Sequence, residues 1–298
     1  MPGLQEPKQL RVRAWDHRAV TTYRADGSPL RVVLIGAGDL GIRVGTALAD
    51  AGHHVTGVRR TIDALPAQIT GLSADLATDD LPDLPADLLL VALAPDQRDE
   101  TGYRHTYVEA MRRGVDAVLR AGTPRRAVLI SSTSVYGDIE GEIDEDTAPA
   151  PATGRAEVLL EAERLFHDRT KGAVLRLSGL YGAPGNRLVT RVRQGENRDP
   201  GRWTNRMHRD DAAAAAVHLL TRVDPLQPLY IGTDDEPATA GAVRDFVADE
   251  LGVPRPEPTG STEPSGRRMS NARLRESGFR LRYPTFREGY RAQVQLDS

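Results

Sequence analysis

The chain has 298 residues and contains no cysteine. This excludes disulfide bonds and thiolate metal sites, and it is typical of proteins from a reducing compartment. We therefore expect a cytoplasmic protein. Lysine is nearly absent too, because Lys8 and Lys171 are the only lysines among the 39 basic residues. In a chain this rich in arginine, a pair of adjacent arginines is weak evidence for a binding site.

Long apolar runs and an excess of one charge are also missing. No stretch approaches the roughly 18–20 apolar residues that cross a membrane, and the charged N-terminal residues lack the apolar segment of a signal peptide. The formal net charge is -3. Such a balance offers no polyanion-binding surface. We expect a small molecule as the partner, and neither a membrane nor nucleic acid.

The sequence does contain short apolar runs that alternate with amphipathic stretches. We predict strands at residues 32–35, 55–58, 88–93, 127–131, 174–177 and 229–231. We predict helices at residues 40–51, 107–119, 157–166, 211–220 and 242–251. This alternation is typical of βαβ units. The predicted fold class is α/β, a doubly wound parallel sheet of the Rossmann type with a smaller C-terminal substrate-binding lobe.

We predict three regions along the chain. Residues 1–30 lack useful periodicity and are expected to be an N-terminal extension. Residues 31–180 are predicted to form the dinucleotide-binding domain. Residues 181–298 are predicted to form mostly the substrate-binding lobe, with residues 205–233 returning to the Rossmann sheet. We expect the stretches 185–203 and 254–268 to shape the substrate pocket.

The first predicted strand runs directly into Gly36, Gly38 and Gly41, and an amphipathic helix follows. Gly36 permits a tight turn, Gly38 lets the backbone approach a pyrophosphate, and Gly41 allows close packing of helix and sheet. Asp39 and Leu40 supply backbone amides at the positive end of the helix dipole. A glycine turn without a ligand is the alternative. The strand before it and the helix after it favour dinucleotide binding.

The second predicted strand ends at Arg59 and Arg60. In NAD-binding units an acidic residue at this place, about 20 residues after the glycines, accepts hydrogen bonds from the ribose. An acid would repel a 2′-phosphate, whereas guanidinium groups can hold it. We therefore favour NADP(H) over NAD(H) as the cofactor. The alternative is two solvated arginines.

Further motifs follow in a fixed order after the glycine turn. They are residues 131–137 at a strand end, Arg176 with residues 180–182, residues 205–211, and residues 230–237. Together these motifs resemble the extended short-chain dehydrogenase/reductase superfamily, also called the NAD-dependent epimerase/dehydratase family. The resemblance covers residues 31–298 and implies the Rossmann fold.

The resemblance also implies roles for individual residues. Ser132 matches the catalytic Ser or Thr that hydrogen-bonds the reacting carbonyl oxygen. Asp75 and Leu76 match a position that contacts adenine, although an Asp after a short strand is commonly a turn residue. We also predict that Leu93 contacts the cofactor.

One element of the family is missing. The family uses a Tyr-x-x-x-Lys pair, in which the tyrosine transfers a proton and the lysine lowers its pKa. None of the eight tyrosines has a lysine four residues later, and the matching helix start at residues 153–157 reads Thr-Gly-Arg-Ala-Glu. The chain thus resembles atypical members, especially a bacterial epimerase-like subgroup that it matches at residues 93–95, 103–107 and 270–290.

Three residues are candidates for the missing proton transfer by homologous position: Tyr136, Tyr181 and His208. A histidine with an unperturbed pKa of about 6.5 donates or accepts near neutrality. The alternative for His208 is structural, because its segment helps to join the two lobes in the family. The two tyrosines are equally consistent with pocket walls. We expect no metal site, because His53 and His54 are adjacent on a strand and point to opposite faces, and the acidic residues 234–236 lie at a turn.

The leading functional hypothesis is an NADP(H)-dependent oxidoreductase of the epimerase/dehydratase-like type, acting on a small organic carbonyl or sugar-like substrate. One alternative is a catalytically silent dinucleotide-binding sensor or scaffold. Another is a nucleotide-sugar epimerase/dehydratase, which would depend most on the missing pair. The oligomeric state is open. Relatives often pair through helices that correspond to residues 103–119 and 157–166, which suggests a homodimer.

Overall fold

The computed structural model describes Arg24, residues 26–183 and residues 186–296. Most of the predicted N-terminal extension lies outside these described residues. So do residues 184 and 185, where one of the stretches expected to shape the pocket begins. The last residue before the first strand, Leu30, is fully buried in the core. Arg24 forms an ion pair with Asp87 at 2.6 Å.

A seven-stranded sheet forms the centre of the larger lobe, with the strand order β11-β7-β5-β4-β1-β2-β3. All of its neighbouring strands are parallel. Its strands are β1 (Arg31–Ile35), β2 (His54–Arg59), β3 (Ile69–Ser73), β4 (Leu88–Val91), β5 (Arg126–Ser132), β7 (Ala173–Leu177) and β11 (Leu229–Gly232). The strand order reverses between β1 and β4, which places a crevice at the carboxyl ends of these strands. The predicted α/β fold of the Rossmann type is confirmed.

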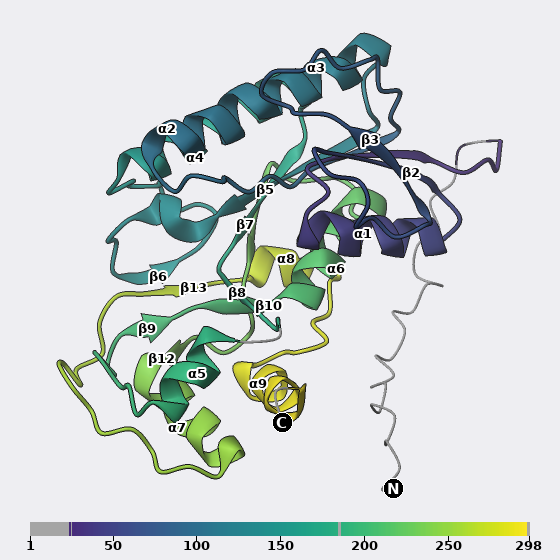
Figure 1. Ribbon diagram of the computed structural model, residues 1–298. Helices are drawn as coiled ribbons and strands as arrows, with labels where there is room; N and C mark the ends of the chain where they lie inside the picture. The colour runs from purple at the N-terminus through teal and green to yellow at the C-terminus, as the bar shows by residue number, and fades with distance from the viewer. Residues whose placement is uncertain (1–23, 25, 184–185, 297–298) are drawn as a thin grey trace, which may run out of the picture.

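Helices cover both faces of this sheet (Figure 1). The helices α1 (Asp39–Asp50) and α6 (Arg209–Thr221) pack in one core with β1, β4, β5 and β7. On the opposite face, α3 (Met111–Ala121) and α4 (Gly154–Thr170) bury their apolar residues in a second core. Apolar residues recur along these helices on the side that faces the sheet, which is the reason for their placement.

The segment before α3 is an unusual helix. Here α2 (Glu100–Tyr103) continues into the π-helix η2 (Arg104–Ala110), which continues into α3. A short 3-10 helix, η3 (Thr133–Tyr136), follows β5 and leads toward β6 (Gly141–Ile143).

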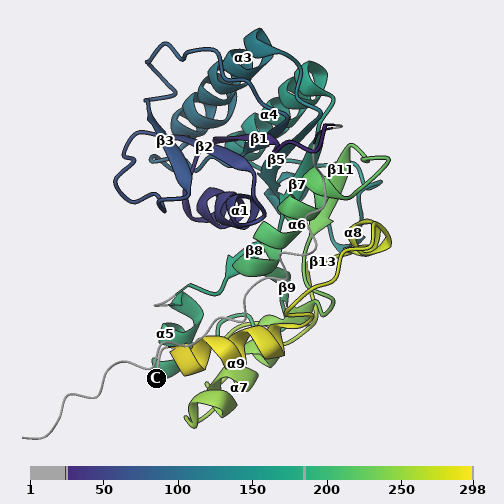
Figure 2. The same ribbon diagram turned by 90° about the vertical axis from the view of Figure 1, so that its right-hand side faces the viewer.

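The C-terminal part of the chain builds a smaller lobe beneath the sheet (Figure 2). Its small paired strands are β8 (Gly179–Tyr181) with β10 (Arg206–His208), and β9 (Trp203–Thr204) with β12 (Ala238–Thr239). Its helices are α5 (Arg187–Arg193), α7 (Ala240–Leu251) and α9 (Phe286–Leu296). The strands β8 and β12 and the three helices share their own apolar core.

Two elements connect this lobe to the larger one. The strand β13 (Arg267–Met269) pairs with β6 from the larger lobe. The helix α8 (Ala272–Glu276) follows it and lies against β11. The chain therefore crosses between the lobes at the carboxyl edge of the sheet, where ligands bind in open α/β folds. None of the helices in the described part of the chain is both long and apolar enough to cross a membrane.

Candidate functional site

Gly36 and Gly41 have no room for a side chain. Gly36 has φ +89°, and a Cβ atom there would lie 2.6 Å from the carbonyl oxygen of Ala92 at the end of β4. A Cβ atom on Gly41 would lie 2.5 Å from the carbonyl oxygen of Gly36. Both contacts are with backbone, which cannot move aside cheaply. These two glycines are therefore required by the packing of the turn itself.

Gly38 differs from its neighbours, because a Cβ atom on it would meet no described atom within 4 Å. Gly38 is also the N-cap of α1, and no side chain caps the helix there. The first amides of a helix need hydrogen-bond acceptors, and the helix dipole favours an anion as the acceptor. The turn thus leaves an open cradle that fits the pyrophosphate of a dinucleotide.

The two arginines after β2 lie beside this turn but have different partners. The Arg59 guanidinium donates a hydrogen bond of 3.0 Å to the carbonyl oxygen of Ala37, inside the glycine turn. Arg60 pairs with Asp96 at 2.6 Å on the exposed surface. The hydrogen bond to Asp96, together with its charge, raises the pKa of Arg60. The structure therefore brings Arg59 to the turn and directs Arg60 toward the loop after β4.

Of the remaining predicted cofactor residues, one lies against the glycine turn. Leu93 is closest, because its Cδ2 atom would lie 2.9 Å from a Cβ atom on Gly36. Leu76 is 8% exposed and belongs to the core on the α3 and α4 face. The Asp75 carboxylate accepts a hydrogen bond of 2.9 Å from the amide of Ala77, so it stabilises its own turn.

Four charged residues join the first turns of α1 and α6, and we call them the α1–α6 ion-pair network. Arg209 donates to the Asp39 carboxylate at 3.0 Å. Arg43 lies 3.4 Å from the same carboxylate and forms a second, short ion pair with Asp210. The cofactor-binding residue predicted at position 39 is thus held by two arginines. Leu40, the next residue, is partly buried against the core.

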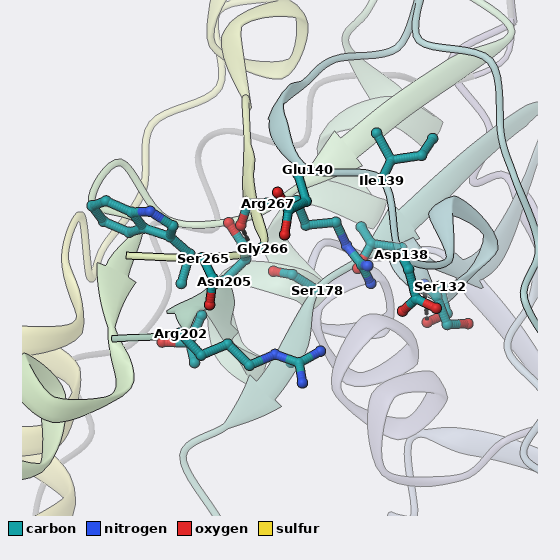
Figure 3. Close-up of a pocket in the computed structure, with 15 residues that line it drawn as sticks. Ser132, Asp138, Ile139, Glu140, Ser178, Arg202, Asn205, Ser265, Gly266 and Arg267 are labelled. Atoms are coloured by element: carbon teal, nitrogen blue, oxygen red, sulfur yellow. Dashed lines mark hydrogen bonds between the residues drawn. The ribbon is translucent and has the colours of Figure 1, made fainter. Parts of the chain in front are cut away.

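A pocket of about 520 Å³ lies between the sheet edge and the smaller lobe (Figure 3). Its lining comes from the end of β5, the loop before β6, the start of β8, β9 and the segment before β13. The lining residues are Ser132, Thr133, Ser134, Asp138, Ile139, Glu140, Ser178, Gly179, Arg202, Trp203, Thr204, Asn205, Ser265, Gly266 and Arg267. Residues from both lobes line the pocket. They include residues from both stretches that were expected to shape it, 185–203 and 254–268.

Ser132 is the predicted catalytic residue that lines this pocket. It is the last residue of β5, and its Oγ accepts a hydrogen bond of 3.1 Å from the amide of Ser134. A hydroxyl that accepts in this way keeps its own proton available for donation. Ser178 directly follows Leu177 of the neighbouring strand β7, which pairs with Ser132, and the Ser178 hydroxyl donates to the carbonyl oxygen of Gly232 at 3.0 Å.

Two arginines give the pocket positive charge. The Arg202 guanidinium extends into the pocket (Figure 3), and no acidic side chain of the described residues forms an ion pair with it. Arg267 donates a short hydrogen bond to the carbonyl oxygen of Gly137. Burial, followed by the charge of Arg202, lowers the pKa of Arg267. Asp138 and Glu140 line the same pocket beside Arg267, and the charge of Asp138 acts against this lowering of the pKa of Arg267.

Asn205 fixes the wall of the pocket formed by β13. Its side-chain amide donates to the carbonyl oxygen of Arg267 at 3.0 Å, and its side-chain oxygen accepts from the amide of Met269 at 2.7 Å. One side chain therefore satisfies two backbone groups of that strand. This arrangement holds Arg267 at the pocket edge.

Tyr136 lies outside this pocket. It is fully buried, and its hydroxyl donates a hydrogen bond of 3.1 Å to the carbonyl oxygen of Asp144. The Arg176 guanidinium lies over its ring at 5.0 Å and also forms a buried ion pair of 2.6 Å with Glu163. Burial, more than any nearby charge, raises the pKa of Tyr136. The structure thus places this phenol in the core under the pocket.

Tyr181 and His208 lie together at the junction of β8 and β10, also away from the pocket lining. Their rings meet edge to face at 5.2 Å, and the His208 ring packs on Tyr283 at 4.0 Å. The Nδ1 atom of His208 accepts from the amide of Asp210 and caps α6. Burial lowers the pKa of His208 to about 4 and raises that of Tyr181.

The helix start that replaces the Tyr-x-x-x-Lys pair also has a structural use. The Thr153 hydroxyl accepts from the amide of Ala156 and caps α4. A Cβ atom on Gly154 would overlap the Glu100 carboxylate, so glycine leaves room for that side chain. Glu157 is exposed. No phenol therefore reaches the pocket from this helix.

Several pocket residues were not singled out from the sequence, namely Asp138, Glu140, Ser178, Arg202 and Arg267. Ser178 carried a usable signal, because it directly follows a predicted strand at the ligand edge of the sheet. The acids follow the motif at residues 131–137 at short distance. The two arginines could not be recognised individually, because 37 of the 39 basic residues are arginine and a single arginine therefore does not stand out.

Three features together define an extended short-chain dehydrogenase/reductase fold. They are the glycine turn after β1, the reversal of strand order between β1 and β4, and a pocket that the C-terminal lobe helps to form. No protein-family profile matches the sequence. Protein YeeZ from Escherichia coli (strain K12) is 32% identical over 270 residues, which cover 85% of this chain and 96% of that protein.

Solved structures agree with this comparison. A structure from Methylobacillus flagellatus, provisionally assigned as an NAD-dependent epimerase/dehydratase, has a TM-score of 0.77 and 33% identity over 90% of this chain and 99% of that one. MoeE5 in complex with UDP-glucose and NAD has a TM-score of 0.73 and 25% identity over 89% of this chain and 97% of that one. The chain belongs to the NAD-dependent epimerase/dehydratase family.

Proposed function

We propose that this protein is an NADP(H)-dependent oxidoreductase that acts on a small carbonyl or sugar-like substrate carrying an acidic group. The observation that carries the proposal is the pocket lined by both the Ser132 hydroxyl and the Arg202 guanidinium, at the same sheet edge as the open Gly38 cradle. The NAD bound to MoeE5, a structural neighbour, supports a dinucleotide in the cradle, whereas the choice of NADP(H) rests on Arg59 beside the glycine turn.

Each group in the pocket has a defined chemical use in this proposal. When bound, the dinucleotide supplies or accepts a hydride. Ser132 donates a hydrogen bond to the reacting carbonyl oxygen, because its own acceptor site is satisfied by the amide of Ser134. Arg202 binds the carboxylate or phosphate of the substrate and orients it. Because no phenol or imidazole of the described residues lines the pocket, water or a group of the substrate completes the proton transfer.

The test begins with binding and continues with turnover. Purified protein is titrated with NADPH and NADH by fluorescence, and then mixed with pairs of carbonyl compounds that differ only by an acidic group. We expect loss of reduced-cofactor absorbance with the acidic member of a pair. Arg202→Ala should raise KM for that compound by at least about tenfold, the size of one charged hydrogen bond. A chain that binds neither dinucleotide would contradict the proposal.

Cofactor preference is tested separately. Arg59→Ala and Arg60→Ala should each weaken NADPH and leave NADH nearly unchanged, because only NADPH carries the 2′-phosphate. Arg120→Ala, which removes an exposed ion pair with Asp83, is a matched control. An equal loss of affinity for NADPH and NADH would overturn the proposal that these arginines bind the 2′-phosphate. Tight binding without turnover of any compound would favour the sensor or scaffold alternative, which the pocket without a phenol also allows.

A further inference from the structure

Arg209 occupies a position that helix stability does not explain. It is the first residue of α6, where the helix dipole disfavours a positive charge. Its neighbours Asp210 and Asp211 have the charge that suits this end of the helix. Yet the Arg209 side chain is only 21% exposed, and its Nε atom is buried without a hydrogen bond. A positively charged side chain at this end of a helix, with one N–H donor that has no acceptor, indicates a role other than stabilising the helix.

The partner of Arg209 indicates that role. Its guanidinium is bonded to Asp39, the residue that follows Gly38 in the open cradle. A pyrophosphate in this cradle would bring further negative charge next to the Asp39 carboxylate, and like charges repel. Arg43 cannot relieve this repulsion alone, because it is shared with Asp210. Arg209 has no second acid among the described residues.

We propose that Arg209 is a phosphate-binding residue of the cofactor site and reaches the dinucleotide pyrophosphate from the first turn of α6. This inference rests on the proposed function, because it concerns the same cofactor. It assigns to the segment between the lobes a direct contact with the dinucleotide. The cofactor would then be held by α1 through backbone amides and by α6 through a side chain.

The first experiment measures affinity by calorimetry for NADPH, NADH and ADP-ribose. All three carry the pyrophosphate, so Arg209→Ala should weaken each by at least tenfold, whereas Arg59→Ala and Arg60→Ala should weaken NADPH alone. Arg209→Lys should retain part of the affinity. Arg104→Ala, which removes an exposed pair with Glu161 on the other face, should bind as the wild type does. Melting temperatures confirm that each variant folds.

A double-mutant cycle with Asp39→Asn separates contact with phosphate from simple neutralisation of Asp39. Asp39→Asn should bind dinucleotide at least as tightly as the wild type, because a repulsive charge is gone. If Arg209 contacts phosphate, the Asp39→Asn, Arg209→Ala variant stays at least tenfold weaker than Asp39→Asn. If that double variant binds as tightly as Asp39→Asn, or if Arg209→Ala binds like the wild type, this inference is wrong. Wild-type protein that binds none of the three ligands would overturn the proposed function and this inference with it.

Discussion

Burial sets the protonation of several single residues at the lobe junction, and His208 is the clearest example. With its pKa lowered to about 4, its imidazole is neutral near pH 7 and serves as an acceptor for the amide of Asp210. It therefore caps α6 and packs against Tyr283. The alternative stated from the sequence, a structural role, agrees with this placement.

Substitution of His208 separates a structural role from a role in proton transfer. His208→Asn keeps a side-chain acceptor for the cap, whereas His208→Ala removes the cap and leaves a cavity, so we expect Ala to lower the free energy of unfolding by about 1–3 kcal/mol more than Asn. Urea denaturation of both variants measures this difference. Turnover by His208→Asn should stay within a few-fold of the wild type. A loss of a hundredfold or more in both variants would show that His208 transfers a proton.

Asp234 gives a pH dependence of stability. It is 2% exposed, and burial raises its pKa to about 8, although the charge of Arg206 acts in the opposite direction. A carboxyl whose pKa is higher in the folded protein than in the unfolded chain stabilises the fold below the unfolded value, and this stability is lost as the pH rises through the folded value.

We therefore expect the wild type to lose stability relative to Asp234→Asn as the pH rises from about 4 to about 8, by at most about 1.4 kcal/mol for each pH unit. Chemical denaturation of both proteins across this range measures the difference. Glu288→Gln is a control, because the pKa of this partly exposed carboxyl is lowered by its hydrogen bonds with Thr285. Parallel curves for the wild type and Asp234→Asn would contradict the expectation.

At the scale of elements, the glycine turn between β1 and α1 contains two kinds of glycine. Gly36→Ala places a side chain at φ +89° and against a backbone oxygen, which should destabilise the protein by about 2 kcal/mol or more. Gly38→Val meets open space and has extended dihedral angles that valine adopts, so stability should change by about 1 kcal/mol or less. Dinucleotide affinity should nevertheless fall at least tenfold.

Thermal denaturation and calorimetry measure the two quantities on the same samples. Gly252→Ala, at a helix C-cap with φ +66° far from the turn, is a control for strain without loss of binding. If Gly38→Val binds dinucleotide as the wild type does, the open cradle is not the cofactor site.

Elements with strong periodicity were predictable from the sequence, whereas short ones were not. The six predicted strands of the sheet and the helices that cover it follow from apolar patterns, and they are present. The strand β3 was missed, because Ile69–Ser73 is short and interrupted by Gly71. The two-residue strands β9 and β12 depend on pairing across 34 residues between Thr204 and Ala238, which no local pattern reveals.

The candidate site was predictable only in part, for the same reason. The glycine turn and Ser132 stand in local motifs beside strong strands. The pocket, however, is completed by Arg202, which directly precedes β9, and by Arg267, the first residue of β13. Their positions depend on tertiary contacts such as the two hydrogen bonds of Asn205, and these contacts are not encoded by spacing.

At the scale of the whole molecule, the homodimer through residues 103–119 and 157–166 remains a prediction. The ion pair between Arg104 and Glu161 lies exposed on these helices, with side chains 45% and 47% exposed. Leu180, the exposed large apolar residue of the described surface, lies elsewhere on β8. An interface through these helices would therefore include this ion pair but not Leu180.

The pocket and the α1–α6 ion-pair network both join the two lobes, so cofactor binding should stabilise the whole molecule. At 100 times its dissociation constant, NADPH should add about 2.7 kcal/mol to the free energy of unfolding, which for a chain of 298 residues corresponds to a rise in melting temperature of about 4 °C. Because a ligand stabilises only the state that binds it, Gly38→Val, with at least tenfold weaker affinity, should show about half of this rise or less at the same NADPH concentration. A single calorimetric transition that shifts to higher temperature with NADPH would show that the cofactor stabilises both lobes. Two transitions, with only one displaced by NADPH, would instead show that the smaller lobe, which has its own core, unfolds independently of the cofactor.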